Sequence, residues 1–131
     1  MISEEDLWWR PNEASNSVGN LLLHMSGNLR QWIVSGVGGA SDERDRPSEF
    51  EAEGGRSLAE LMETVETTAA AADQTLANLR ESSLIDRITV QSFDVTRLHA
   101  VYHSIEHFSY HLGQIAYVAK LRKGEDLSIF P

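Results

Sequence analysis

Four of the five histidines follow one another at steps of four residues, and their type and spacing suit metal chemistry. They are His99, His103, His107 and His111. A helix turns by about 100° per residue, so each four-residue step moves the series about 40° around the helix. Neighbouring members of the series can share a metal ion, but all four cannot converge on one ion. The spacing therefore predicts that one adjacent pair serves as ligands.

His107 and His111 form the pair nearest the expected buried side of this helix. Six apolar residues at helical spacing point within about 40° of one direction and predict that side: Val101, Ile105, Phe108, Leu112, Ile115 and Ala119. His111 lies about 80° from this direction and His107 about 120°, whereas His103 and His99 lie about 160° away. The two latter histidines are therefore expected on the outer side.

The fifth histidine, His24, has a similar position on an earlier helix. The expected core side of that helix is formed by Val18, Leu21, Met25, Leu29 and Trp32. His24 lies about 100° from the centre of this side. Two packed helices could therefore bring His24, His107 and His111 into one cleft beside the core.

Three neutral imidazoles suit a divalent ion such as Zn, Ni or Fe, and Cu is also compatible. Three protein ligands leave a coordination position open, which is the catalytic pattern, and a metal bound in this way lowers the pKa of a bound water or thiol. The chain has no cysteine, so a cysteine-ligated site and a cysteine nucleophile are excluded. The alternative is that the histidines are simply packed or exposed, as histidines commonly are.

Three helical stretches must position these side chains. The first spans residues 16–35, with Asn and Ser at its start as caps and three glycines, Gly36, Gly38 and Gly39, at its end. The second begins with a capping box, Ser57 to Glu60, and continues to about Arg80. Between them, residues 40–55 are polar and predict a loop.

The third helix is expected to begin at Asp94 or Thr96 and to end near Lys123, where Gly124 suits the stop. Residues 82–94 are compatible with a short extended piece or with an ordered loop. Three long helices predict an all-α fold, an antiparallel helical bundle. A length of 131 residues fits a single domain over residues 1–131.

Charge and hydropathy exclude several partners. The formal net charge is −9, so nucleic acid and an anionic membrane surface, which both require clustered Lys and Arg, are disfavoured. No run of 18 apolar residues occurs, and the start MISEEDLWW carries acids where a signal peptide has basic residues. We therefore expect a cytoplasmic protein that acts on a small molecule.

The motifs around the histidines resemble those of the DinB-like superfamily of metal-dependent enzymes. The resemblance rests on NSVGNLLLHMSGNLRQWI from Asn16, on Glu49-Phe50, and on EHFSYHLGQI from Glu106, and it spans nearly the whole chain. In that superfamily one histidine of the second bundle helix and an HxxxH pair of the last helix bind a divalent metal. The resemblance thus implies His24, His107 and His111 as metal ligands.

One departure from the DinB-like pattern concerns the N-terminus. Family members usually begin with a further amphipathic helix, which is apparently missing here because Met1 leads almost directly into the segment that normally follows it. Apolar side chains would then need covering: Leu23, Val34, Tyr117 and Leu121. We therefore predict a homodimer or a domain-exchanged assembly, the alternative being a start codon placed too late.

The resemblance also implies an activity, because some DinB-like relatives are similar to transferases in which the metal binds a low-molecular-weight thiol. A thiol S-transferase suits a chain without cysteine, since the nucleophile would arrive with the cosubstrate. Metal-assisted hydrolysis is a second possibility, with Glu49 folding over the site as the base and with Arg44 and Arg46 binding an anionic substrate group.

The third possibility is a non-catalytic helical oligomer with a structural or vestigial metal site. In every case Asn28 and Gln114 are candidates to hydrogen-bond the histidines, because a ligating imidazole needs a partner for its other ring nitrogen. For Gln114 a surface amide is the competing interpretation.

Overall fold

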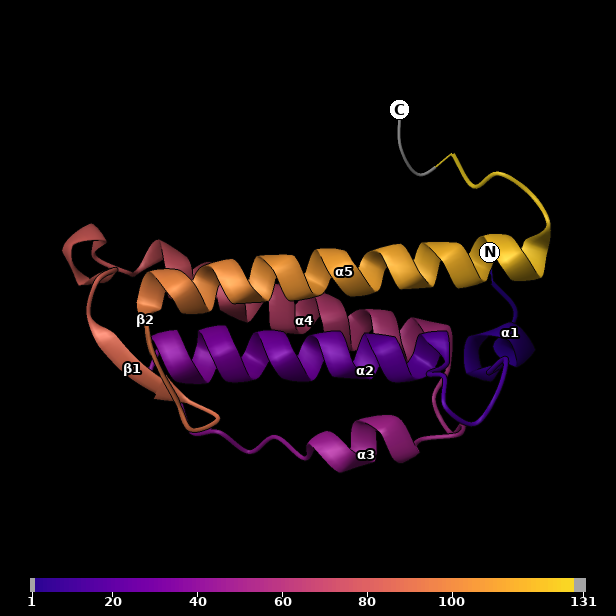
Figure 1. Cartoon of the computed structure of the whole chain (residues 1–131), viewed down its shortest axis with the longest axis horizontal. Coiled ribbons are helices and arrows are strands. Elements are labelled where there is room, and N and C mark those ends of the chain that lie inside the picture. The colour runs from indigo at the N-terminus through magenta and orange to yellow at the C-terminus, as the bar shows by residue number, and fades with distance from the viewer. Residues whose placement is uncertain (1, 129–131) are drawn as a thin grey trace.

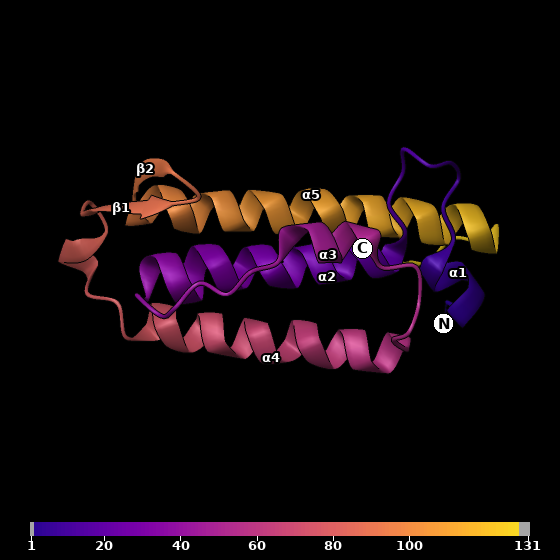
Figure 2. The ribbon, with the colours of Figure 1, turned by 90° about the horizontal axis from the view of Figure 1, so that it is seen from below.

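Three long helices form the body of the protein in the computed structural model, which describes residues 2–128. They are α2 (Val18–Leu29), which continues into the π-helical η1 (Arg30–Val37), α4 (Leu58–Ala77) and α5 (Arg97–Lys123). The predicted all-α bundle is confirmed. In Figure 2, α2 lies between α4 and α5.

The helix directions differ in one respect from the predicted antiparallel arrangement. α5 runs antiparallel to α2, but α4 runs parallel to it (Figure 1). The segment between η1 and α4 returns along the whole length of α2, so that Ala52 near its end accepts a hydrogen bond from Asn20 at the start of α2. A connection of this length permits a crossover, whereas a short turn would have forced α4 to be antiparallel.

The crossover contains a short helix, α3 (Arg46–Glu51), so the prediction of a loop over residues 40–55 is wrong for these six residues. Asp45 caps α3 by accepting the Ser48 backbone N–H, and Pro47 occupies its first turn, where proline is well tolerated. A polar helix of six residues has too few apolar positions to show a helical period, and this is why the pattern missed it.

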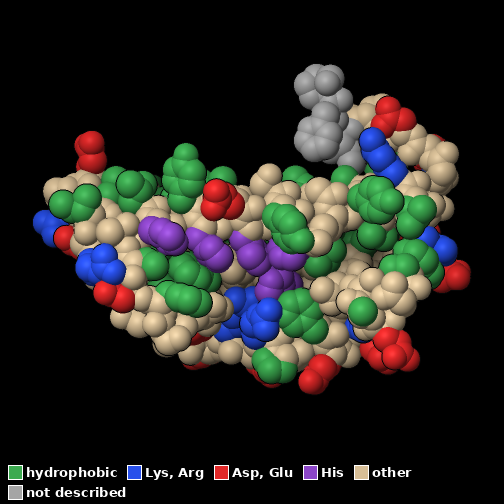
Figure 3. Space-filling model, in the orientation of Figure 1, with side chains coloured by type: hydrophobic (Ala, Val, Ile, Leu, Met, Phe, Trp, Pro, Cys, Tyr) green, Lys and Arg blue, Asp and Glu red, His purple; other side chains and the backbone are tan. Residues whose placement is uncertain are grey.

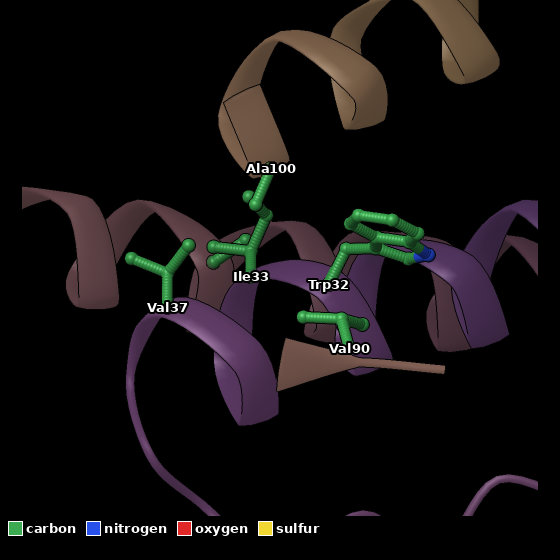
Figure 4. Packing of buried hydrophobic residues seen from close by; sticks show 6 residues of the cluster. Trp32, Ile33, Val37, Val90 and Ala100 are labelled. Carbon is green, nitrogen blue, oxygen red and sulfur yellow. The ribbon is translucent and has the colours of Figure 1, made fainter. Parts of the chain in front are cut away.

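Residues 82–94, which the sequence left undecided, fold as a 3₁₀ turn, η2 (Glu81–Ser83), and most of a β-hairpin. The strands β1 (Arg87–Val90) and β2 (Phe93–Thr96) pair antiparallel. Both residues of the turn between them, Gln91 and Ser92, have positive φ, as a type I′ hairpin turn requires. Val90 is the buried residue of β1 and packs near Trp32 (Figure 4).

The ends of the long helices agree well with the predicted caps. Ser17 caps α2 and Ser57 caps α4, both in capping boxes. Thr96, one of the two candidates, caps α5 by accepting the His99 backbone N–H. Gly124 ends α5 in the left-handed conformation, with φ of 66°. These local signals depend on few residues, and so the sequence reveals them directly.

Two clusters of buried side chains hold the bundle together. One surrounds η1 and the hairpin (Figure 4) and consists of Trp32, Ile33, Val37, Ala72, Val90 and Ala100. The other lies at the opposite end and consists of Leu7, Val18, Leu22, Leu61 and Val65. Leu7 belongs to the single-turn helix α1 (Glu4–Trp8), which is the only helix before α2 in the described part of the chain.

The predicted buried side of α5 is only partly correct: Val101, Phe108 and Ile115 are half-buried and pack against the two clusters, but they are not the most buried residues of the helix. The fully buried residues of this helix are the small Ala100 and Ser104, whereas Ile105 is 61% exposed and Leu112 is 41% exposed. Small residues allow α5 to approach α2 and η1 closely, and this contact turns the histidines inward. The apolar side instead borders a groove of about 390 Å³ between α4 and α5.

The four side chains predicted to need covering divide into two pairs. Leu23 and Val34 are half-buried against the two clusters, so the bundle itself covers them. Tyr117 and Leu121 remain 70% and 58% exposed. Within residues 2–128, none of the helices combines the length and the apolar character needed to cross a membrane.

Candidate metal centre

The structure brings together the three histidines that the sequence singled out. His24 comes from the middle of α2 and is buried, and His107 and His111 come from α5 and are half-buried. The His24 and His107 Nε2 atoms are 2.9 Å apart. One ring nitrogen from each of the three residues lies within 4.8 Å of the others. Figure 3 shows the histidine side chains in a row that runs from the left part of the viewed face to its middle.

A carboxylate fixes the orientation of His24. The Glu49 Oε2 atom, from α3, lies 2.9 Å from His24 Nδ1. Arg44 Nη2, a donor, lies 3.0 Å from the same nitrogen, but Glu49 Oε2 serves as its acceptor. An ionised carboxylate can only accept a hydrogen bond, so the proton on Nδ1 donates to Glu49. The Nε2 lone pair then points toward His107 and His111. This carboxylate–histidine arrangement is the usual support of a metal-binding imidazole.

Arg44 in turn holds Glu49. Arg44 Nε donates to Glu49 Oε1 at 2.7 Å, and Arg44 Nη2 donates to Oε2 at 2.8 Å. Arg44 Nη1 also donates to Gln31 Oε1 at 2.9 Å. Burial alone raises the pKa of Glu49, but the hydrogen bonds from Arg44 and His24 outweigh burial and leave this pKa below its ordinary value. Glu49 is therefore ionised and locked in place.

Gly27 makes room for this pair, a role that the sequence analysis missed. A Cβ atom at position 27 would lie 2.0 Å from Glu49 Oε1 and 2.9 Å from Arg44 Nε. The glycine allows α3 and the segment before it to close over α2 at the level of His24. A glycine in the middle of a helix, where it costs stability, was the signal that could have revealed this role.

The two α5 histidines of the cluster, His107 and His111, are neutral at ordinary pH. Burial, which contributes most, and the nearby His111, His24, His103 and Arg44 together lower the pKa of His107 to about 3. Burial also lowers the pKa of His111, although its hydrogen bond to Gln114 acts in the opposite direction. A neutral imidazole has a free lone pair, which is the form that binds a metal.

Gln114 supports His111 as Glu49 supports His24. The His111 Nδ1 atom lies 2.7 Å from Gln114 Oε1, an acceptor, so this nitrogen carries the proton and Nε2 is free. Of the two candidate hydrogen-bonding residues, the structure therefore places Gln114 beside the cluster. The Asn28 amide instead lies 3.5 Å from His103 Nε2.

His99 and His103 stay outside the cluster. His103 lies against the Trp32 ring, with ring centroids 4.0 Å apart, and His99 is exposed at the start of α5. The predicted outer position therefore holds for His99 but is wrong for His103, because the side of α5 that packs on η1 includes His103.

The expected substrate-binding arginines have other contacts. The Arg44 side chain is buried, with 5% exposure, and donates to Glu49 and Gln31. Arg46 lies over the Phe50 ring, 5.0 Å from its centroid. Glu49 lies on the Nδ1 side of His24, away from the other histidines, so the structure does not place it over the site as a general base.

The donor set fits a divalent metal ion. Among the described residues, the group with metal-binding geometry consists of three imidazoles, two of them with the second ring nitrogen hydrogen-bonded. Three nitrogen donors suit Zn, Ni or Fe.

Comparison with known proteins identifies a family but no function. A search of curated proteins gave no match. A family model described as a protein of unknown function (DUF1572) matches residues 1–130, nearly the whole chain. The protein therefore belongs to the DUF1572 family.

Proposed function

We propose that the protein is a metal-dependent enzyme that holds one divalent ion through His24, His107 and His111. The observation that supports this most strongly is the convergence of three imidazole nitrogens within 4.8 Å, from two different helices. Three protein ligands leave coordination positions open to a small molecule, which distinguishes a catalytic site from a closed structural one.

Neighbouring residues orient the histidines for metal binding. Glu49 and Gln114 orient two of the imidazoles, and Arg44 keeps Glu49 ionised. The low pKa of His107 keeps this residue unprotonated at neutral pH, so that no proton competes with the ion. A bound divalent ion would supply a Lewis acid that stabilises negative charge on an oxygen or sulfur atom of a substrate.

More specifically, we propose a low-molecular-weight-thiol S-transferase. The resemblance of the histidine motifs to DinB-like enzymes supports this proposal, as does the absence of cysteine, which means that a nucleophilic sulfur must arrive with a cosubstrate. In this reaction a C–S bond forms, the bond to a leaving group breaks, and the thiol proton passes to solvent.

Hydrolysis has less support. A hydrolase needs a base near the open side of the site, and the contacts of Glu49 with Arg44 and His24 occupy its carboxylate. Glu106, the nearest acid along α5, is exposed on the helix surface.

Elemental analysis of the full chain, purified without an affinity tag or a chelator, tests the metal centre. We expect about one equivalent of a divalent metal in the wild type and in His99→Ala, a matched control on the same helix. His107→Ala should lose it. A wild-type protein without metal, also after incubation with Zn²⁺, Ni²⁺ and Fe²⁺, would overturn the proposal.

Metal removal then separates an enzyme from a structural metal protein. A catalytic ion should cost chiefly activity, measured as consumption of cysteine or glutathione in the presence of an alkyl or aryl halide. A structural ion should instead lower the melting temperature strongly. Hydrolysis of an ester without thiol consumption would favour the hydrolase.

A further inference from the structure

A cavity of about 560 Å³ lies beside the histidine cluster, between the segment at residues 9–16 and the second half of α5. Its walls are largely aromatic and aliphatic. They include Trp9, Pro11, Tyr110, Tyr117, Val118 and Leu121. Every described side chain that lines the cavity is uncharged. This lining is typical of a site for an apolar small molecule.

The cavity shares residues with the surroundings of the cluster. Gln114 lines it and also accepts the hydrogen bond from His111 Nδ1. Tyr110 lines it and packs edge-on against His111, with ring centroids 5.0 Å apart. Leu21, on the α2 side, lies one helical turn before His24. A molecule in the cavity would therefore lie beside the two residues that contact His111.

Gly113 provides an independent indication of a ligand. It lies in the interior of α5, where glycine costs about 0.8–1.0 kcal/mol relative to alanine. Its backbone does not need glycine, because its φ is not positive. Packing does not need glycine either, because, apart from its chain neighbours and the adjacent helix backbone, no described atom lies within 4 Å of where its Cβ would be. Yet it lines the cavity between Tyr110 and Tyr117, where a larger side chain would take up the space.

We infer that this cavity binds the apolar, uncharged body of the substrate, a small molecule with an aromatic or alicyclic ring. The inference rests on the proposed function, since it assigns the reactive end of that molecule to the histidine cluster. Tyr110, Tyr117 and Trp9 offer ring faces and edges for stacking. The proposed reaction joins two substrates, a thiol and an electrophile. Because the thiol is charged, the apolar body in the cavity belongs to the electrophile, which accepts the sulfur.

Titration of the full chain with benzamide, followed by ¹H–¹⁵N NMR, tests the assignment. We expect saturable shifts of the Trp9 indole N–H and the Gln114 side-chain amide, assigned with Trp9→Phe and Gln114→Glu. Acetamide, which has the same amide but no ring, should bind at least tenfold more weakly. Gly113→Leu should weaken benzamide binding at least tenfold, and Gly113→Ala, the matched control, should bind more tightly than Gly113→Leu.

A second variant keeps the test decisive if Gly113→Leu fails to fold. Tyr117→Ala removes an exposed wall without adding volume, and it should weaken benzamide binding several-fold. Unchanged binding in the folded variants, or shifts confined to the groove between α4 and α5, would overturn the inference.

Failure of the metal proposal would be visible separately. His107→Ala should lose the metal and keep benzamide binding, because His107 does not line the cavity. If the wild type holds no metal but still binds benzamide in this cavity, the result would contradict the proposed metal centre and support the cavity as a ligand site. If the metal-loaded Gly113→Leu variant turns over ring-containing electrophiles as well as the metal-loaded wild type, the result would contradict the assignment of the cavity but not the metal centre.

Discussion

The two helices that supply the histidines differ greatly in how much of their surface is covered. α2 buries nine of its 12 residues, among them the polar Asn20, His24 and Asn28. α5 buries only Ala100 and Ser104 of its 27 residues. α2 is enclosed by α3, α4 and α5 (Figure 2), whereas α5 packs mainly on α2 and η1.

This difference divides the site into a fixed half and an open half. On the α2 side, His24, Glu49 and Arg44 form a buried chain of hydrogen bonds whose geometry leaves little freedom. On the α5 side, His107 and His111 are half-buried, and two residues in contact with His111, Tyr110 and Gln114, line a cavity. Rigidity on one side and access on the other are what a site for a reacting small molecule requires.

Acid should have the largest effect, because it acts on both halves. The pKa of His107 is about 3 in the folded protein and about 6.5 ordinarily. Between these values the unfolded chain takes up a proton that the folded chain refuses, so stability falls as pH decreases from 6.5 toward 3. The lowered pKa of Glu49 acts in the same direction below pH 4.5. The groups that face His107 are His24, His103, His111 and Arg44.

Urea unfolding of the metal-free protein at a series of pH values measures this effect. The quantity of interest is the slope of the unfolding free energy against pH. In His107→Gln, which cannot take up a proton at this position, this slope should be smaller between pH 6.5 and 4.5 than in the wild type. The same slope in both proteins would show that His107 is not responsible.

Glu49→Gln should disrupt the fixed half. The substitution leaves the buried Arg44 guanidinium without its counter-charge, which costs about 3–5 kcal/mol of unfolding free energy. It should also weaken metal binding by about 10- to 100-fold, because His24 loses its carboxylate partner. Glu51→Gln, an exposed change in the same short helix, should alter stability by less than about 0.5 kcal/mol. If the two variants have equal effects in urea unfolding and in metal titration, Glu49 does not have the assigned role of supporting Arg44 and His24.

Alanine substitutions at two helix-interior glycines should have opposite effects. Gly27→Ala places a Cβ against Glu49 and Arg44, and we expect a loss of about 1–3 kcal/mol. The Cβ of Gly113→Ala meets no described atom within 4 Å apart from its chain neighbours and the adjacent helix backbone, so this variant should gain up to about 1 kcal/mol from helix propensity. Chemical denaturation of both variants measures the contrast. A gain in both would mean that the α2 side is not tightly packed.

The smallest effect on the fold is expected from Ile105→Glu, on the exposed apolar side of α5. The stability of a single chain should change little, because the side chain is mostly exposed. If a second copy of the predicted homodimer covers the groove between α4 and α5, the buried charge should abolish association. Light scattering should then show a dimer for the wild type and a monomer for Ile105→Glu. A monomeric wild type would refute the homodimer prediction.

The sequence by itself determined the number, caps and ends of the long helices and the histidines that the structure brings together. Caps such as Ser17, Ser57 and Thr96 act within three residues, so the local sequence is enough to recognise them. Three-residue and four-residue spacing likewise placed His24, His107 and His111 on faces that could meet.

Only the tertiary structure decided which side of α5 is buried and what supports the histidines. The periodicity of α5 pointed to Ile105 and Leu112, but close packing on α2 favoured the smaller Ala100 and Ser104. The contact of Glu49 with His24 spans 25 residues and depends on α3 and Gly27, which no local pattern links. Helix caps are local interactions, whereas packing depends on neighbours far away in the chain, and only the folded chain brings those neighbours together.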